Sequence, residues 1–243
     1  MADKYTSVSP YAYCAWNPVK LVDPDGREVT DFKDKNGNLI KHIEDGQDVS
    51  YTIKGTGVHE HFEYESGEIN AGNIDYQTSL VVQEQQFYNL KNPDLKEKTD
   101  PQTGSSNTFC NYATQNIQEA VESIPGNNNV VTAGSANDMA KTMAKSDNYI
   151  AVTQQEALNY SDQGFLVISS WINPSGRHGH VATLSVGSNR AVGKEYANIG
   201  LALYSGFTSF GSTYGKSKQP NVIHYVYMRS SCKLVKIVDN KPN

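Results

Sequence analysis

The stretch Asn107-Thr-Phe-Cys-Asn-Tyr-Ala-Thr-Gln-Asn-Ile-Gln-Glu-Ala-Val-Glu-Ser-Ile124 decides how this chain of 243 residues is expected to fold. Its apolar residues recur with the three- and four-residue spacing of one helical face: Ala113, Ile117, Ala120, Val121 and Ile124. Asn107 or Thr108 is predicted to cap the helix, and Pro125-Gly126 is predicted to end it. The pattern therefore places Cys110 in the first helical turn.

A cysteine in a first helical turn has two interpretations. Unpaired backbone N–H groups and the positive end of the helix dipole favour a reactive thiolate there, and the same N–H groups can hold an oxyanion. Alternatively, Cys110 is a small apolar side chain buried on the helix face. Cys14 and Cys232 have no comparable setting, and three unevenly spaced cysteines argue against a disulfide framework.

A second decisive stretch is Gly176-Arg-His-Gly-His-Val-Ala-Thr-Leu-Ser-Val-Gly187, in which a glycine-containing loop delivers His180 to the start of an apolar strand. A cysteine nucleophile needs an imidazole held on a rigid element, so His180 is the predicted base. His178 is expected nearby, as a substrate contact. Zinc binding by His178 and His180 is the alternative; it would need further His, Cys or carboxylate ligands, and His59 and His61 form a second such pair.

A third polar group normally orients a catalytic imidazole. Glu195 and Asn198 are the candidates on the following strand, and period two puts them on opposite faces, so one of them can point at His180. Asn198 is favoured because its amide oxygen can accept from the imidazole Nδ1–H without adding a charge. Trp171 and Tyr112 are expected to line the cleft, as substrate contacts.

The surrounding pattern predicts an α+β fold, with helices followed by a run of strands. Asn36-Gly37 and Asp45-Gly46 predict turns between short strands in a small β linker or cover over residues 29–75. The predicted enzyme domain covers residues 76–243. Its helices are expected at 76–88, 136–145 (capped by Ser135) and 154–160, and its strands at 165–171, 181–186, 191–198, 222–228 and 233–238.

Several of these segments resemble a known family. Thr108-Phe-Cys-Asn-Tyr-Ala-Thr-Gln-Asn-Ile, Ala136-Asn-Asp-Met, Gln163-Gly-Phe-Leu-Val-Ile-Ser-Ser and Gly179-His-Val-Ala are similar to NlpC/P60- and CHAP-like peptidoglycan amidases. The resemblance covers about residues 107–228 and implies a papain-like fold, a Cys110–His180 dyad and no metal or organic cofactor. Many relatives have Asp where this chain has Phe109, which favours the effector-type and CHAP-like branches.

The N-terminal stretch Ser9 to Arg27, which contains Tyr11-Ala-Tyr-Cys-Ala-Trp-Asn-Pro-Val-Lys-Leu-Val-Asp-Pro-Asp-Gly-Arg27, resembles the end of an Rhs-repeat-associated core. That resemblance implies an end segment over residues 1–28, followed by a toxin that acts on another bacterium. The expected substrate is a peptidoglycan peptide or muropeptide in the target's periplasm or cell wall, and an immunity protein is an expected partner.

Charge and hydropathy narrow the alternatives. A net charge of −5 without any basic run argues against nucleic-acid binding, and no apolar run is long enough to cross a membrane. Two other functions remain open. One is a cysteine protease or deamidase toxin that acts on a protein. The other is a non-catalytic cell-wall-binding module that has kept the fold.

Overall fold

The computed structural model describes residues 29–69, 77–90, 109–127, 131–176, 178–187, 191–200 and 206–228. The Rhs-like segment over residues 1–28 and the strand expected at 233–238 lie outside these ranges. The described residues form a mixed α+β structure with two sheets and five α-helices, as the sequence predicts at the level of fold class. None of the described helices combines the length and apolar character that a bilayer crossing demands.

The first sheet has four strands in the order β2-β1-β3-β4. These are β1 (Val29–Lys33), β2 (Leu39–Glu44), β3 (Asp48–Lys54) and β4 (His61–Glu68), with a short 3-10 helix, η3 (Gly57–His59), before β4. The predicted Asn36-Gly37 turn joins the antiparallel pair β1 and β2, and Gly37 adopts a φ of 83° that favours glycine.

The second sheet has six strands in the order β5-β10-β6-β7-β8-β9, and every neighbouring pair is antiparallel. Its members are β5 (Tyr149–Val152), β6 (Val167–Trp171), β7 (His180–Leu184), β8 (Tyr196–Asn198), β9 (Gly206–Thr208) and β10 (Val222–Tyr227). The short 3-10 helix η5 (Gln219–Asn221) leads into β10. The strands predicted at 165–171, 181–186 and 222–228 are confirmed within a few residues.

Five α-helices accompany the sheets: α1 (Thr78–Leu90), α3 (Cys110–Glu122), α4 (Ala136–Met143), α5 (Gln154–Asp162) and α6 (Phe210–Tyr214). Ser135 caps α4 as predicted, and its side chain and that of Asp138 form a reciprocal capping box. Such a box satisfies two backbone N–H groups that the first helical turn leaves unpaired.

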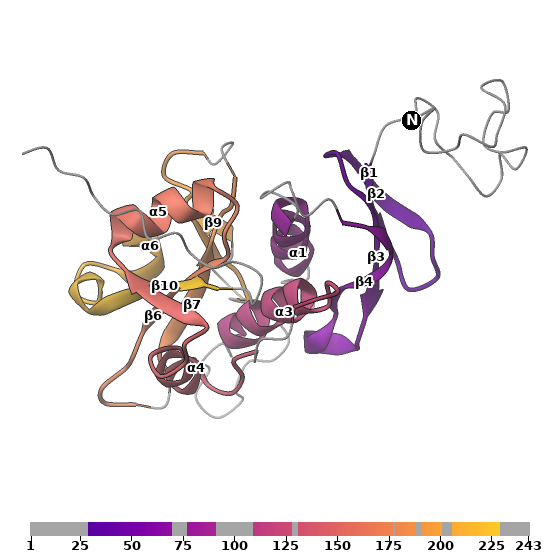
Figure 1. The fold of residues 1–243 in the computed structure, drawn as a ribbon. Helices are drawn as coiled ribbons and strands as arrows, with labels where there is room; N and C mark the ends of the chain where they lie inside the picture. The colour runs from indigo at the N-terminus through magenta and orange to yellow at the C-terminus, as the bar shows by residue number, and fades with distance from the viewer. Residues whose placement is uncertain are drawn as a thin grey trace, which may run out of the picture.

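Helices α1 and α3 lie between the two sheets (Figure 1). On one side, Phe32, Tyr51 and Phe62 of the four-stranded sheet pack with Ala120 of α3 and with Ile124, which follows the helix. On its other side, α3 packs on the six-stranded sheet through a core that includes these residues: Ile117, Ile168, Val181, Ala197 and Tyr225. The strands expected as a separate linker or cover therefore share a core with the helix that carries Cys110.

A third core lies on the far face of the six-stranded sheet, and α5 and α6 supply part of it. Val167, Leu184 and Val226 of the sheet meet Tyr214 of α6 there. The expected strand over 191–198 is too long, because a turn occupies Val192-Gly193 and only the last three residues pair with neighbours. Val192 is 98% exposed, so nothing holds that end of the segment in the sheet.

Candidate active site

Cys110 is the first residue of α3, at the position the sequence predicts, and it is 3% exposed. The predicted cap is wrong, because Phe109 is the N-cap residue and makes no side-chain cap bond. The Phe109 N–H instead donates to the carbonyl of Gly200 at 2.6 Å. A long-range backbone contact therefore fixes the start of this helix, in place of a local Asn or Thr side chain.

Gly200 lies directly against the backbone of Phe109 and Cys110. Its φ is +79°, in the left-handed region that favours glycine. A Cβ at this position would lie 2.6 Å from the carbonyl carbon and oxygen of Phe109 and 2.9 Å from the backbone nitrogen of Cys110. The position therefore requires glycine both for its backbone conformation and for space.

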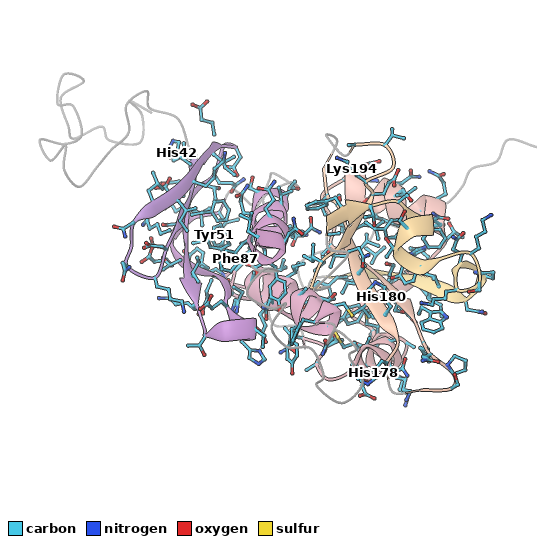
Figure 2. The ribbon with its side chains drawn as sticks, turned by 180° about the vertical axis from the view of Figure 1, so that it is seen from behind. His42, Tyr51, Phe87, His178, His180 and Lys194 are labelled. Atoms are coloured by element: carbon cyan, nitrogen blue, oxygen red, sulfur yellow. The ribbon has the colours of Figure 1, made fainter. Side chains whose placement is uncertain are left out.

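His180 is the first residue of β7, and its imidazole and the Cys110 thiol interact electrostatically, each shifting the pKa of the other. Its Nε2 lies 2.9 Å from Oδ1 of Asn198, the last residue of β8. Figure 2 shows His180 among the packed side chains of the six-stranded half of the molecule. The structure thus brings together the three residues predicted as catalytic: Cys110, His180 and Asn198.

The contact with Asn198 fixes which nitrogen of His180 faces the thiol. An amide oxygen only accepts, so Nε2 carries a proton and donates it to Asn198. The other nitrogen, Nδ1, is therefore the one that faces Cys110. Asn198 therefore bonds Nε2, and the expected bond to the Nδ1–H is wrong.

The Tyr214 ring holds the imidazole from the side, with ring centroids 5.3 Å apart at an angle of 65°. The Tyr214 hydroxyl lies 2.6 Å from Ser169 Oγ, and that Oγ donates to the carbonyl of Ala182. Since the single Ser169 proton is used in this way, Tyr214 donates to Ser169. The chain of contacts anchors the aromatic ring that packs against His180.

Neighbouring charges set the protonation of the dyad. Burial alone would raise the pKa of Cys110, but His180 and the backbone N–H groups of Val181 and Asn111 outweigh it, and the pKa is lowered. For His180, burial would lower the pKa, but the Cys110 sulfur and Asn198 raise it, while Lys218 acts in the lowering direction. Both shifts favour a thiolate–imidazolium pair.

Glu195, the other candidate for orienting His180, does not face it. Its carboxylate accepts the backbone N–H of Gly193 at 2.7 Å, in the turn that precedes β8. Glu195 precedes β8, so strand alternation does not set its direction, and Glu195 and Asn198 have different partners.

The residues expected to line the cleft occupy different places. Trp171 is the cross-strand partner of His180, between β6 and β7. His178 is exposed in the loop before β7 and lies at the rim of the molecule (Figure 2). Tyr112 packs against the His59 ring at 5.0 Å and the Phe109 ring at 6.1 Å.

The four histidines considered for zinc do not form a site with other ligands. His61 Nδ1 lies 3.5 Å from Glu119, and His59 packs on Tyr112. Within the described ranges, no three His, Cys, Asp or Glu side chains gather as a metal site would require.

Three residues near the dyad are not singled out by sequence patterns: Ser169, Gly200 and Lys218. For the glycine- and serine-rich stretch around Tyr214, sequence patterns allow either a cleft wall or core packing, and Tyr214 is buried. No local signal marks Gly200 or Lys218, because each acts through contacts with residues distant in sequence. In comparisons with known proteins, no family model and no curated protein matches this chain.

Proposed function

We propose that the chain is a cysteine hydrolase of papain-like type that cleaves amide bonds in peptidoglycan, and that it serves as the effector domain of an Rhs-type protein. One observation carries the chemistry. Cys110 at a helix start, His180 at a strand start and Asn198 on the next strand come together, with His180 hydrogen-bonded to Asn198 and coupled electrostatically to Cys110. The wall substrate and the delivery to a target's periplasm or cell wall rest on the sequence resemblance.

Catalysis begins with the thiolate–imidazolium pair. The Cys110 sulfur attacks the amide carbonyl carbon, and the C–N bond breaks after a tetrahedral intermediate. The imidazolium of His180 gives its Nδ1 proton to the departing amine. The acyl group remains on Cys110 as a thioester. His180 then takes a proton from water, the hydroxide displaces the sulfur, and the carboxylic acid product leaves with the thiolate restored.

The oxyanion of both intermediates needs donors at fixed positions. The backbone N–H of Cys110 is suited to this role, because the first residues of a helix have no intrahelical acceptor for their N–H groups. Gly200 leaves open the space where a side chain would meet that nitrogen. Asn198 holds the imidazole, so its role is positioning rather than bond making.

The test is digestion of purified peptidoglycan sacculi, followed by mass spectrometry of the released fragments. The wild-type protein is expected to release muropeptides with new amine and carboxyl ends, and Cys110→Ala is expected to release none while folding normally. Cys232→Ala is the control and is expected to keep full activity. Release by Cys110→Ala at the wild-type rate would contradict the assignment.

Two outcomes would point to the other functions. Inactivity on sacculi, with toxicity only on cytoplasmic expression, would indicate a protein target in place of the wall. Cys110 is only 3% exposed, which favours the second alternative function, a wall-binding module without catalysis. A Cys110 thiol that stays inert to iodoacetamide at neutral pH would support that module.

A further inference from the structure

A hollow of about 610 Å³ opens at the end of β6 and the start of β10. Apolar side chains supply much of its lining: Trp171, Ile172, Pro174 and Ile223. Ile172 and Ile223 are each about two-fifths exposed, although both are large apolar residues. An apolar hollow with a few polar groups is the usual form of a small-ligand site.

Lys218 supplies the charge of this hollow. Its ammonium lies 4.8 Å from the centroid of the Trp171 ring, so the aromatic face holds the cation in place. Lys218 makes no ion pair with any residue in the described ranges. A positioned, partly buried cation without a protein counter-ion is suited to an anionic ligand.

The hollow is next to the reaction centre. Trp171 is paired with His180 across β6 and β7, and directly opposed residues on antiparallel strands lie about 5 Å apart. The charge of Lys218 also acts electrostatically on the His180 ring. A group bound against Lys218 would therefore lie on the side of the dyad that His180 occupies.

We propose that this hollow is a substrate subsite that binds a free carboxylate of a peptide, with Lys218 as its counter-ion and Trp171 as its apolar wall. The inference rests on the proposed function and deepens it, since it names peptides with a carboxylate beside the scissile amide as the substrate class. It also links binding to the dyad. A carboxylate on Lys218 offsets the charge that opposes protonation of His180, so substrate binding favours the ion pair.

Binding can be measured without cleavage. The chain has two tryptophans, so the full-length Trp16→Phe, Cys110→Ala protein reports on Trp171 alone by fluorescence. The probes are acetyl-alanyl-alanine with a free C-terminal carboxylate and the same dipeptide with a C-terminal amide. We expect the carboxylate form to bind about tenfold more tightly, as a charge-assisted contact provides.

Three variants sharpen the test. Lys218→Gln should abolish the preference for the carboxylate, and Lys218→Arg should keep it. Lys216→Gln is the matched control, because Lys216 lies two residues away on the same loop and is exposed. Thermal unfolding of each variant checks that its fold is intact.

Equal affinity for the two probes, binding of neither, or a preference that survives in Lys218→Gln would overturn the subsite. Because this readout requires no cleavage, its failure is separate from failure of the hydrolase assignment. The sacculus digestion tests that assignment on its own.

Discussion

Replacing Gly200 with alanine is expected to disable Cys110 without removing any polar group. The added Cβ would lie 2.6 Å from the Phe109 carbonyl and 2.9 Å from the Cys110 nitrogen, distances at which the backbone has to move. The moving part is the start of α3, which carries the sulfur. The substitution therefore couples stability and reactivity at a single position.

Two costs add in Gly200→Ala. A left-handed conformation costs a non-glycine residue about 1–2 kcal/mol, and crowding in a packed region costs about 1–3 kcal/mol more. The free energy of unfolding should therefore fall by about 2–5 kcal/mol. A shift of roughly 1 Å at a reacting group costs on the order of 100-fold in rate, so we expect at least that loss of amide hydrolysis.

Gly193→Ala separates the two costs. Gly193 has nearly the same φ, +76°, but an added Cβ there meets no atom within 4 Å. It should lose only about 1–2 kcal/mol of stability and no activity. Urea unfolding and the rate of hydrolysis by the folded fraction are the measurements. Equal stability losses for the two variants, or an unchanged rate in Gly200→Ala, would refute the close-approach argument.

Three further predictions concern positioning and pH. Asn198→Ala should slow hydrolysis about ten- to hundredfold, since a hydrogen bond to a charged group contributes about 1.5–3 kcal/mol. Loss of this bond should also lower the pKa of His180, so activity should be lost at a lower pH on the alkaline side. Glu195→Ala should have neither effect, and pH–rate profiles of both variants are the measurement. His224 is 3% exposed and burial lowers its pKa to about 4, so the unfolded chain takes up a proton first as pH falls below about 6.5. About 3 kcal/mol of stability is then lost down to about pH 4, and urea unfolding should show His224→Phe losing less over that range. Glu84 is fully buried, and its pKa is raised well above the usual value, so its contribution to stability falls as pH rises from about 4.5. Glu84→Gln keeps an acceptor for the Phe62 N–H and should raise the thermal unfolding midpoint more at alkaline than at acidic pH. An equal change at both pH values would contradict the claim that the buried Glu84 carboxyl group is protonated.

Local patterns in the sequence were sufficient for several parts of the site. The apolar spacing after Cys110 predicts α3 because one face of that helix packs on a sheet. Asn198, favoured for its neutral amide oxygen, does contact His180. Each of these inferences uses residues that are close in sequence, and their geometry follows from one element or one strand pair.

The parts that the sequence analysis missed depend on long-range packing. The cap of α3 was assigned to a nearby Asn or Thr, whereas Gly200, some ninety residues away, accepts the Phe109 N–H. Five-residue α6 is too short to show a period, yet it brings Tyr214 onto His180. Strand β9 pairs three residues at the sheet edge, and none of them is buried. Such contacts arise only when the sheet order is known.

The four-stranded sheet shows a related limit of local patterns. Its turns follow from Asn36-Gly37, but nothing in the strands themselves indicates that they pack on α1 and α3. Burial of Glu84 at that junction, with one carboxylate oxygen bound to the Phe62 N–H, also depends on the assembled layers. The spacing of apolar residues and the turn residues predict where helices and strands lie. Which face of a strand or helix packs on which neighbour is seen only in the three-dimensional structure.

The rate at which iodoacetamide alkylates Cys110, measured against pH by peptide mass spectrometry, tests the central claim most directly. If the thiolate–imidazolium pair exists, the wild-type thiol should react well below the pH at which an ordinary thiol ionises, about 8.5. His180→Gln should move that reactivity to alkaline pH. A Cys110 that reacts only at alkaline pH in the wild type, or that stays unmodified throughout, would contradict the account.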